Sequence, residues 1–208
     1  MISLFLNTFS NYLNIVLIKD EKVLDEVYKK LDKDLSKEAL SNIKEVIERN
    51  NLSPDNINEI IIARGPGSFT GLRVGTTIAK VFAYFKNIKL CSVSSLEVMA
   101  TSTEGEIIVP LIDARRDYVY GAIYDKDYNV LMEEKYLKRE DLIKEAEKYN
   151  KKIVYVSNDD FDDLDVKKYE PNSTNLIKYI NKKEEDSKAF IPTYLKRTEA
   201  EENYDKRN

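Results

Sequence analysis

The residues best suited to chemistry form a glycine-rich turn between an apolar run and a helical pattern. Ile60–Ile62 is typical of a strand buried on both faces, and it is followed by Gly65-Pro66-Gly67-Ser68-Phe69-Thr70-Gly71. A helix that starts after such a turn has free backbone N–H groups, which can cradle a phosphate. However, the turn has neither the Gly-Lys-Ser/Thr ending of a Walker motif nor the dinucleotide-binding spacing. An ordinary tight turn, with Ser68 or Thr70 capping the helix, is the competing interpretation.

Other common catalytic groups are scarce. The chain has no histidine, which excludes Ser-His-Asp and Cys-His machinery and histidine-based zinc sites. The one cysteine, Cys91, lies in an apolar run and is predicted to be a buried strand residue. The segment 158–165 has five aspartates, but it lacks the glycine and terminal glutamate of a calcium loop, so a solvated loop is predicted. We expect no cofactor and no metal, while carboxylate chemistry stays open.

Composition limits the class of protein. With 33 Lys+Arg against 37 Asp+Glu, the 208 residues have a formal net charge of −4. Proteins that hold nucleic acid by themselves usually carry a basic face, so direct binding of nucleic acid is not expected. The sequence has no apolar run of about 18 residues, so no membrane span is expected either. Met1–Leu6 lacks the basic start of a signal peptide, and a cytoplasmic protein is predicted.

The elements that must position the turn follow from periodicity. Three apolar runs with tight turns between them predict an antiparallel meander: Ile2–Asn7, Asn14–Lys19 and Val23–Lys30. Helical spacing predicts one helix over Lys33–Asn50 and another over Gly71–Phe85. Gly75 costs the second helix about 1 kcal/mol relative to alanine, which indicates that something packs close to its backbone. Leu90–Val93 is the next strand, and Ser94 or Ser95 caps a short helix after it.

A domain boundary is expected near Thr101–Gly105, which divides the chain into residues 1–103 and a smaller unit of residues 104–208. The second unit should contain three strands, a helix, a fourth strand and a second helix. The strands are Ile107–Ile112, Tyr118–Tyr124, Tyr128–Tyr136 and Ile153–Val156, and the helices are Arg139–Tyr149 and Ser173–Asn181. Lys182–Lys188 reads as a charged linker. The order of elements favours an α/β fold with mixed sheets flanked by helices.

Ala63–Gly75 resembles the signature of the TsaB family, also called YeaZ. Three further stretches agree with that family: Val93–Glu97, Asp113–Arg116 with Tyr118–Tyr120, and Pro192–Lys196 with Glu199-Ala200. The resemblance implies a two-lobed fold of the actin, sugar kinase and Hsp70 type. It also implies a non-catalytic scaffold and activator in the biosynthesis of threonylcarbamoyladenosine in transfer RNA. Its implied partners are the catalytic paralogue TsaD and the ATPase TsaE. The resemblance also implies that the chain forms a homodimer when it is alone and that it contacts transfer RNA only through the complex.

Two positions depart from the family pattern. Members usually carry Asp-Thr-Ser/Thr after the first strand, whereas this chain has Asn7-Thr8-Phe9-Ser10. Many members also have a histidine before the first long helix, and the segment Leu31–Lys37 has none. The rival interpretation, a small ATPase or phosphotransferase of the same fold, needs a carboxylate at the first strand and glycine-rich loops in both lobes. A metallopeptidase is disfavoured, because no pair of histidines is present to hold a metal.

For a scaffold, the expected chemistry is association through helices. The second helix carries two stripes, and the smaller residues of one allow helices to approach closely. One stripe contains Val74, Ile78, Val81 and Phe85, and the other contains Leu72, Thr76, Ala79 and Ala83. We therefore expect the partner surface to contain Leu40, Ile43, Ile47, Leu72, Arg73, Thr76, Ala79 and Ala83. The alternative is that both stripes are core. Arg73 can reach a partner carboxylate, and Arg115 and Arg116 occupy a turn from which they could contact a partner or a phosphate.

Overall fold

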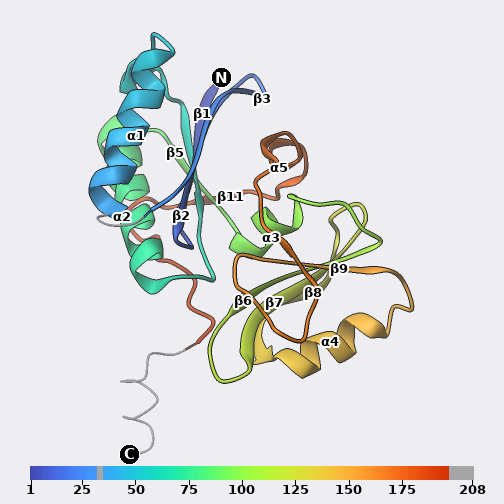
Figure 1. Cartoon of the computed structure of the whole chain (residues 1–208). Helices are drawn as coiled ribbons and strands as arrows, with labels where there is room; N and C mark the ends of the chain where they lie inside the picture. Colours follow the sequence, from blue (N-terminus) through green and yellow to red (C-terminus); the bar gives the residue numbers. More distant parts are fainter. Residues whose placement is uncertain (32–34, 197–208) are drawn as a thin grey trace, which may run out of the picture.

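The computed structural model describes residues 1–31 and 35–196 and shows an α/β protein built on two mixed sheets flanked by helices (Figure 1). The predicted fold class is therefore confirmed. Residues 32–34, which belong to the segment without a histidine and to the expected start of the first helix, lie outside the described residues. Glu199 and Ala200 of the C-terminal resemblance lie outside them as well.

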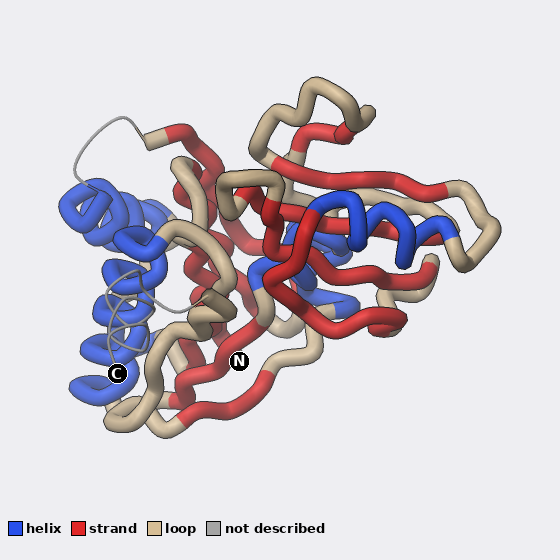
Figure 2. Tube along the Cα trace, turned by 90° about the horizontal axis from the view of Figure 1, so that it is seen from below, coloured by secondary structure: helices blue, strands red, loops and turns tan. Residues whose placement is uncertain are grey.

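The first sheet has the order β11-β5-β4-β1-β2-β3. The predicted meander is confirmed, because β1, β2 and β3 pair antiparallel, whereas β4 pairs parallel with β1 and with β5. The strands are β1 (Ile2–Asn7), β2 (Tyr12–Lys19), β3 (Lys22–Lys30), β4 (Glu59–Ala63), β5 (Lys89–Val93) and β11 (Lys183–Glu185). Helices α1 (Leu35–Arg49) and α2 (Phe69–Lys86) lie together on one face of this sheet, and the short turn η1 (Pro54–Asn56) precedes β4 (Figures 1 and 2).

The second sheet has the order β10-β9-β6-β7-β8. Its strands are β6 (Ile107–Asp113), β7 (Tyr118–Asp125), β8 (Val130–Lys138), β9 (Ile153–Ser157) and β10 (Val166–Lys168). The sheet is also mixed, since β9 runs parallel to β6 and β10 while β7 runs antiparallel to its neighbours. Helix α4 (Arg139–Glu147) covers its outer face, and the short helices α3 (Ser95–Ala100) and α5 (Ser173–Tyr179) lie between the two sheets (Figure 1).

Three apolar clusters hold these layers together. One packs the first sheet against α1 and α2 and includes Ile60, Ile62 and Val46. A second lies between the two sheets and joins Phe5 and Cys91 of the first to residues of the second. A third packs the second sheet against α4. The predicted burial of Cys91 in a strand is confirmed.

The predicted charged linker is wrong in part. Residues 183–185 form β11, which pairs antiparallel with β5 and extends the first sheet. Just before it, Lys182 Nζ lies 2.8 Å from Glu59 Oε2, whose side chain is buried. A charged run can serve as an edge strand because the backbone supplies the pairing and the side chains stay in water or find partners. The division into residues 1–103 and 104–208 stays a prediction. The position of β11 shows that the chain returns to the first sheet after forming the second.

Candidate partner interface

The signature turn is held by the chain itself. Gly65 and Gly67 have φ values of 115° and 157°, as the tight-turn interpretation requires. Ser68 caps α2, because its Oγ accepts a hydrogen bond from the backbone N–H of Gly71 at 3.3 Å. The backbone N–H of Ser68 donates to the carbonyl of Phe9 at 2.7 Å. Since these two N–H groups are already used, the geometry favours a structural turn over a phosphate cradle.

The end of β1 packs directly on the backbone of α2. Thr8 Oγ1 donates to the carbonyl of Gly71 at 2.8 Å, and a Cβ added at Gly75 would lie 2.2 Å from the same hydroxyl oxygen. The predicted close approach at Gly75 is therefore confirmed, and what approaches is the chain's own first strand. Asn7 is 2% exposed, and its Oδ1 accepts a hydrogen bond from the backbone N–H of Phe9 at 3.0 Å. Asparagine thus shapes the turn after β1.

The faces of α2 are opposite to those expected. Leu72, Thr76, Ala79 and Ala83 are all buried within this chain, and Ala79 and Ala83 belong to the cluster between α1, α2 and the first sheet. Their placement at a partner surface is wrong. Short side chains do allow close helix packing here, but the close neighbours are elements of the same chain.

Three large apolar residues in the C-terminal half of α2 are left in water. Val81 is 50% exposed, Tyr84 55% and Phe85 77%. We call these three residues the outer face of α2. The Tyr84 and Phe85 rings contact each other edge to face, with centroids 5.5 Å apart, and Lys188 Nζ lies 5.6 Å from the centre of the Tyr84 ring. The sequence pattern identified a stripe containing Val81 and Phe85, yet periodicity cannot tell which of two stripes faces the sheet.

On helix α1, two of the three expected interface residues are likewise buried. Ile43 and Ile47 are buried against the first sheet, so their placement at a partner surface is also wrong, whereas Leu40 is 55% exposed. Among the expected interface residues only Leu40 and Arg73 have exposed side chains. Burying the β-branched residues of α1 in the chain's own core is favourable because they remove more apolar surface from water than an alanine does.

The first turn of α2 joins the C-terminal segment. The Arg73 guanidinium lies 4.0 Å from the centre of the Phe69 ring, and the Phe69 and Tyr194 rings are 4.9 Å apart. The backbone N–H of Thr193 donates to the carbonyl of Arg64 at 2.8 Å. The stretch Pro192–Lys196, singled out for its resemblance, therefore lies against the signature turn. Arg73 is stacked on an aromatic ring within its own chain, which fixes its direction.

Arg64 is a functional candidate that sequence reasoning missed. Its Nη1 donates to Glu134 Oε1 at 2.5 Å, and Glu134 Oε2 accepts a hydrogen bond from Ser94 Oγ. The pair joins β4 of the first sheet to β8 of the second. An arginine directly after a buried strand was the available signal, but nothing in the sequence pointed to Glu134 as its partner.

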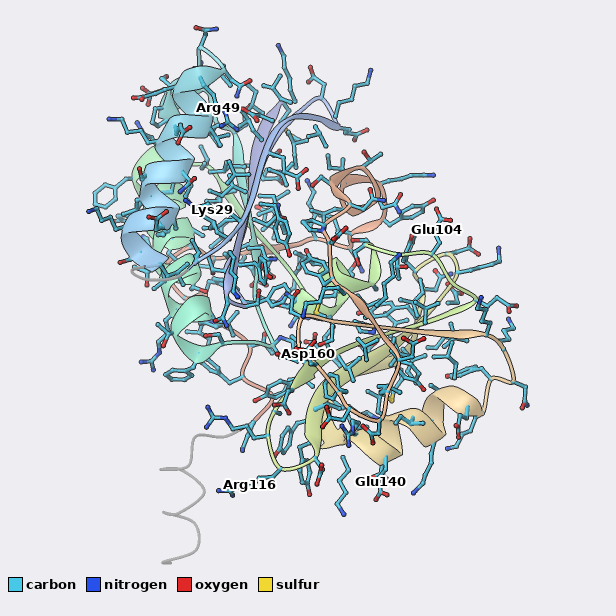
Figure 3. The ribbon with its side chains drawn as sticks, in the orientation of Figure 1. Lys29, Arg49, Glu104, Arg116, Glu140 and Asp160 are labelled. Carbon is cyan, nitrogen blue, oxygen red and sulfur yellow. The ribbon has the colours of Figure 1, made fainter. Side chains whose placement is uncertain are left out.

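Arg115 and Arg116 do not join the outer face of α2. They form the exposed tip of the β6–β7 turn, where Arg115, Arg116 and Asp117 all have positive φ values of 67°, 55° and 61°. Asp113 Oδ1 accepts a hydrogen bond from the backbone N–H of Arg115 at 2.9 Å. Figure 3 shows Arg116 projecting from the end of the second sheet, away from α1 and α2.

A cleft of about 600 Å³ opens between the sheets beside the signature turn. Its lining includes Phe9, Gly67, Arg115 and Asp159. Burial raises the pKa of Asp159, whose Oδ2 accepts a hydrogen bond from the backbone N–H of Asp113 at 2.8 Å. Among residues 1–31 and 35–196, no group of three or more carboxylate or cysteine side chains is placed to hold a metal ion. No helix in that part of the chain has the length and apolar character needed to cross a membrane.

Known proteins resemble this chain in sequence. The family model described as TsaD, tRNA N6-adenosine threonylcarbamoyltransferase, matches residues 23–172. The tRNA threonylcarbamoyladenosine biosynthesis protein TsaB of Bacillus subtilis is 36% identical over 118 residues, covering 55% of this chain and 52% of the relative. The protein of the same name from Escherichia coli is 34% identical over 94 residues, covering 43% and 41%. The match therefore spans about half or less of these relatives' length.

Solved structures share the fold. A structure described as an uncharacterized protein with similarity to peptidase YEAZ from Pseudomonas aeruginosa superposes with a TM-score of 0.79 at 18% identity, covering 94% of this chain and 99% of the other. YeaZ from Pseudomonas aeruginosa gives a TM-score of 0.62 at 22% identity, covering 66% and 67%. At these identities the likeness is one of fold alone.

Proposed function

Because this chain belongs to the TsaB (YeaZ) family, we propose that it is an accessory subunit in the biosynthesis of threonylcarbamoyladenosine in transfer RNA. It performs no chemistry of its own. It pairs with a TsaD-like catalytic paralogue, a TsaE-like ATPase joins the pair, and transfer RNA is met only through the complex. The observation that carries the proposal is the outer face of α2, where Phe85 is 77% exposed.

The outer face suits a protein partner for an energetic reason. Fully burying one large apolar side chain contributes about 1.5–3 kcal/mol, and Val81, Tyr84 and Phe85 each keep half or more of that surface in water. They are adjacent on one helix, so a single partner helix can cover all three. When the paralogue is absent, a second copy of this chain is the occupant of the same face. Leu40 of α1 adds a further exposed apolar residue to the helical layer.

The absence of catalysis is proposed on two local features. The position where a phosphotransferase of this fold needs a carboxylate holds Asn7, which is buried and used in a turn. At the start of α2, the N–H of Gly71 donates to Ser68 Oγ and the N–H of Ser68 donates to the Phe9 carbonyl, so these two groups are not available to a phosphate. The rival function, a small ATPase or phosphotransferase, would bind its nucleotide in the cleft beside the signature turn. A thermal-shift measurement with Mg-ATP separates the two, because a ligand that binds the native state raises the melting temperature. We expect no shift.

The partner proposal is tested by co-purification of the full chain with the TsaD-like protein of the same cell. Phe85→Glu places a charge in the proposed contact and should reduce recovery of the pair at least about tenfold, since each 1.4 kcal/mol corresponds to a factor of ten. The matched control is Leu131→Glu, which replaces a half-exposed leucine on β8. Circular dichroism should be unchanged for both variants. Equal recovery of the two variants would contradict the assignment.

A further inference from the structure

A second cavity, of about 640 Å³, lies between the two sheets on the side of the β7–β8 hairpin. Helix α3 contributes Glu97 to its wall, β7 and β8 contribute Tyr124 and Glu133, and the chain between α5 and β11 contributes Asn181. None of its lining residues lines the cleft beside the signature turn. Its volume falls within the range of about 300–1,000 Å³ that is usual for small-molecule sites.

A tyrosine hydroxyl without a partner faces this cavity. Tyr124 is 4% exposed, and within residues 1–31 and 35–196 its hydroxyl makes no hydrogen bond. Burial raises the pKa of Tyr124, and the negative charges of Glu97, Glu134 and Glu133 raise it further, because these carboxylates lie around the phenol. The hydroxyl oxygen is open to the cavity, so it is available to a ligand that can hydrogen-bond it.

The carboxylates of the cavity outnumber its available cations. Each cationic side chain of the wall is already paired: Arg64 with Glu134, Lys182 with Glu59, and Lys183 with Glu185. By contrast, Glu97 accepts only the backbone N–H of Asn181, at 2.5 Å, and Glu133 has no hydrogen bond or ion pair within the described part of the chain. Neither Glu97 nor Glu133 therefore forms an ion pair within the described part of the chain, although the positive charge of Arg64 acts on Glu97, and both carboxylates act on the Tyr124 phenol.

Two tyrosine rings form another part of the wall. The rings of Tyr128 and Tyr179 contact each other with centroids 4.6 Å apart, and both line the cavity. The Tyr128 hydroxyl donates to the Thr103 carbonyl at 3.0 Å and accepts from Asn175 Nδ2 at 3.2 Å, which holds the ring in place. Lys178 Nζ already lies 4.6 Å from the centre of the Tyr179 ring, so of these two rings it is Tyr128 that can attract an organic cation.

We propose that this cavity binds a small organic cation that carries an ammonium or guanidinium group. The cationic group lies between Glu97 and Glu133 and donates one N–H to the Tyr124 hydroxyl, while its apolar stem contacts Tyr128 and Tyr179. Amines and guanidines share this chemistry, since both combine a positive charge with several N–H donors. The site is independent of the partner interface on α2.

Isothermal titration calorimetry on the purified full chain tests the proposal, with agmatine as probe because it carries a guanidinium at one end and an ammonium at the other. Putrescine, which carries only ammonium groups, and guanidinium are titrated separately to show which of the two cationic groups of agmatine the site binds. The neutral control is 1,4-butanediol. We expect saturable binding of agmatine and none of the diol. Glu97→Gln should weaken binding about tenfold, as expected when a charged hydrogen bond is lost, and Tyr124→Phe should weaken it severalfold.

The matched control for charge is Glu140→Gln on α4, which lies on the outer side of the second sheet (Figure 3). It removes the same charge and should leave agmatine affinity unchanged. Circular dichroism would reveal whether Glu97→Gln or Tyr124→Phe unfolds. In that case Glu133→Gln, which changes an exposed residue of the same site, still tests the proposal. Absence of agmatine binding, equal binding of the diol, or equal weakening by Glu140→Gln would overturn the proposal. Displacement of agmatine by stoichiometric magnesium or calcium would overturn it as well.

Discussion

Arg64, directly after β4, and Glu134, on β8, form an ion pair with a 2.5 Å distance between Nη1 and Oε1, and this pair bridges the two sheets. Both side chains are largely buried, at 27% and 13% exposure, and Arg64 also donates to Thr193 Oγ1 at 3.0 Å. The relative position of the sheets and the path of the C-terminal segment thus depend on the same guanidinium.

Glu134→Gln should lower the free energy of unfolding by about 1–3 kcal/mol, because it leaves a partly buried guanidinium without a counter-charge. Urea denaturation of the wild type and the variant measures this difference. The control is Glu133→Gln, the adjacent exposed residue, which should change the unfolding midpoint little. Equal midpoints for the two variants would show that the pair does not contribute.

Gly75→Ala should destabilise the chain although alanine is the better helix former. The added Cβ would lie 2.2 Å from Thr8 Oγ1 and 3.1 Å from Ile62 Cδ1, so strand and helix must separate. Overpacking of this kind costs about 1–3 kcal/mol, measurable by thermal or urea denaturation. Thr77→Ala, at an exposed position of the same helix, is the control. Combining Gly75→Ala with Thr8→Ala should recover part of the loss; no recovery would place the strain elsewhere.

Ala79→Glu and Phe85→Glu should behave differently although both lie on α2. Ala79 is fully buried between the helix and its own core, so a glutamate there should unfold the chain or lower its melting temperature strongly. Phe85 is exposed, and its replacement should leave the melting temperature nearly unchanged. Circular dichroism melts of the isolated chain decide this. A stable Ala79→Glu variant would mean that the helix can turn its other face to the sheet.

Glu59 should make stability depend on pH in the acid range. Burial by itself would raise the pKa of Glu59, but hydrogen bonds from Lys182, Ser3 and Cys91 outweigh it and leave the pKa below its ordinary value of 4.5. A carboxyl whose pKa is lowered by folding stabilises the native state above the unfolded pKa. That contribution is lost as the pH falls from about 4.5 through the lower native pKa, because in this range the unfolded state binds the proton more readily than the native state.

Urea midpoints of the wild type and Glu59→Gln, compared between neutral pH and the acid range, test this dependence. The wild type should be the more stable protein at neutral pH, and the difference in urea midpoint between it and Glu59→Gln should become smaller as the pH falls. The control is Glu140→Gln, whose residue is exposed and paired only with surface lysines. If the difference in urea midpoint between the wild type and Glu59→Gln stays constant throughout the acid range, Glu59 is excluded as the titrating group.

Local sequence signals were sufficient to predict most of the helices and strands. The β1–β2–β3 meander follows from three apolar runs with polar turns, and Ser68 and Ser94 cap the helices for which they were candidates. The edge strand β11 was not predictable, because charged residues carry no apolar periodicity and the pairing with β5 is made by backbone groups far apart in sequence. The two faces of α2 were recognised as apolar, but their assignment was reversed.

By itself the sequence determined the order of the elements, the tight turn at Gly65–Gly71 and the resemblance to the TsaB family, because each rests on residues close together along the chain. Only the tertiary structure decided which stripe of α2 meets water, which carboxylate pairs with Arg64, and that Tyr124 meets Glu97 and Glu133 at one cavity. These relationships depend on how two sheets and their helices pack, and packing is set by shape and burial summed over the whole chain rather than by any local pattern.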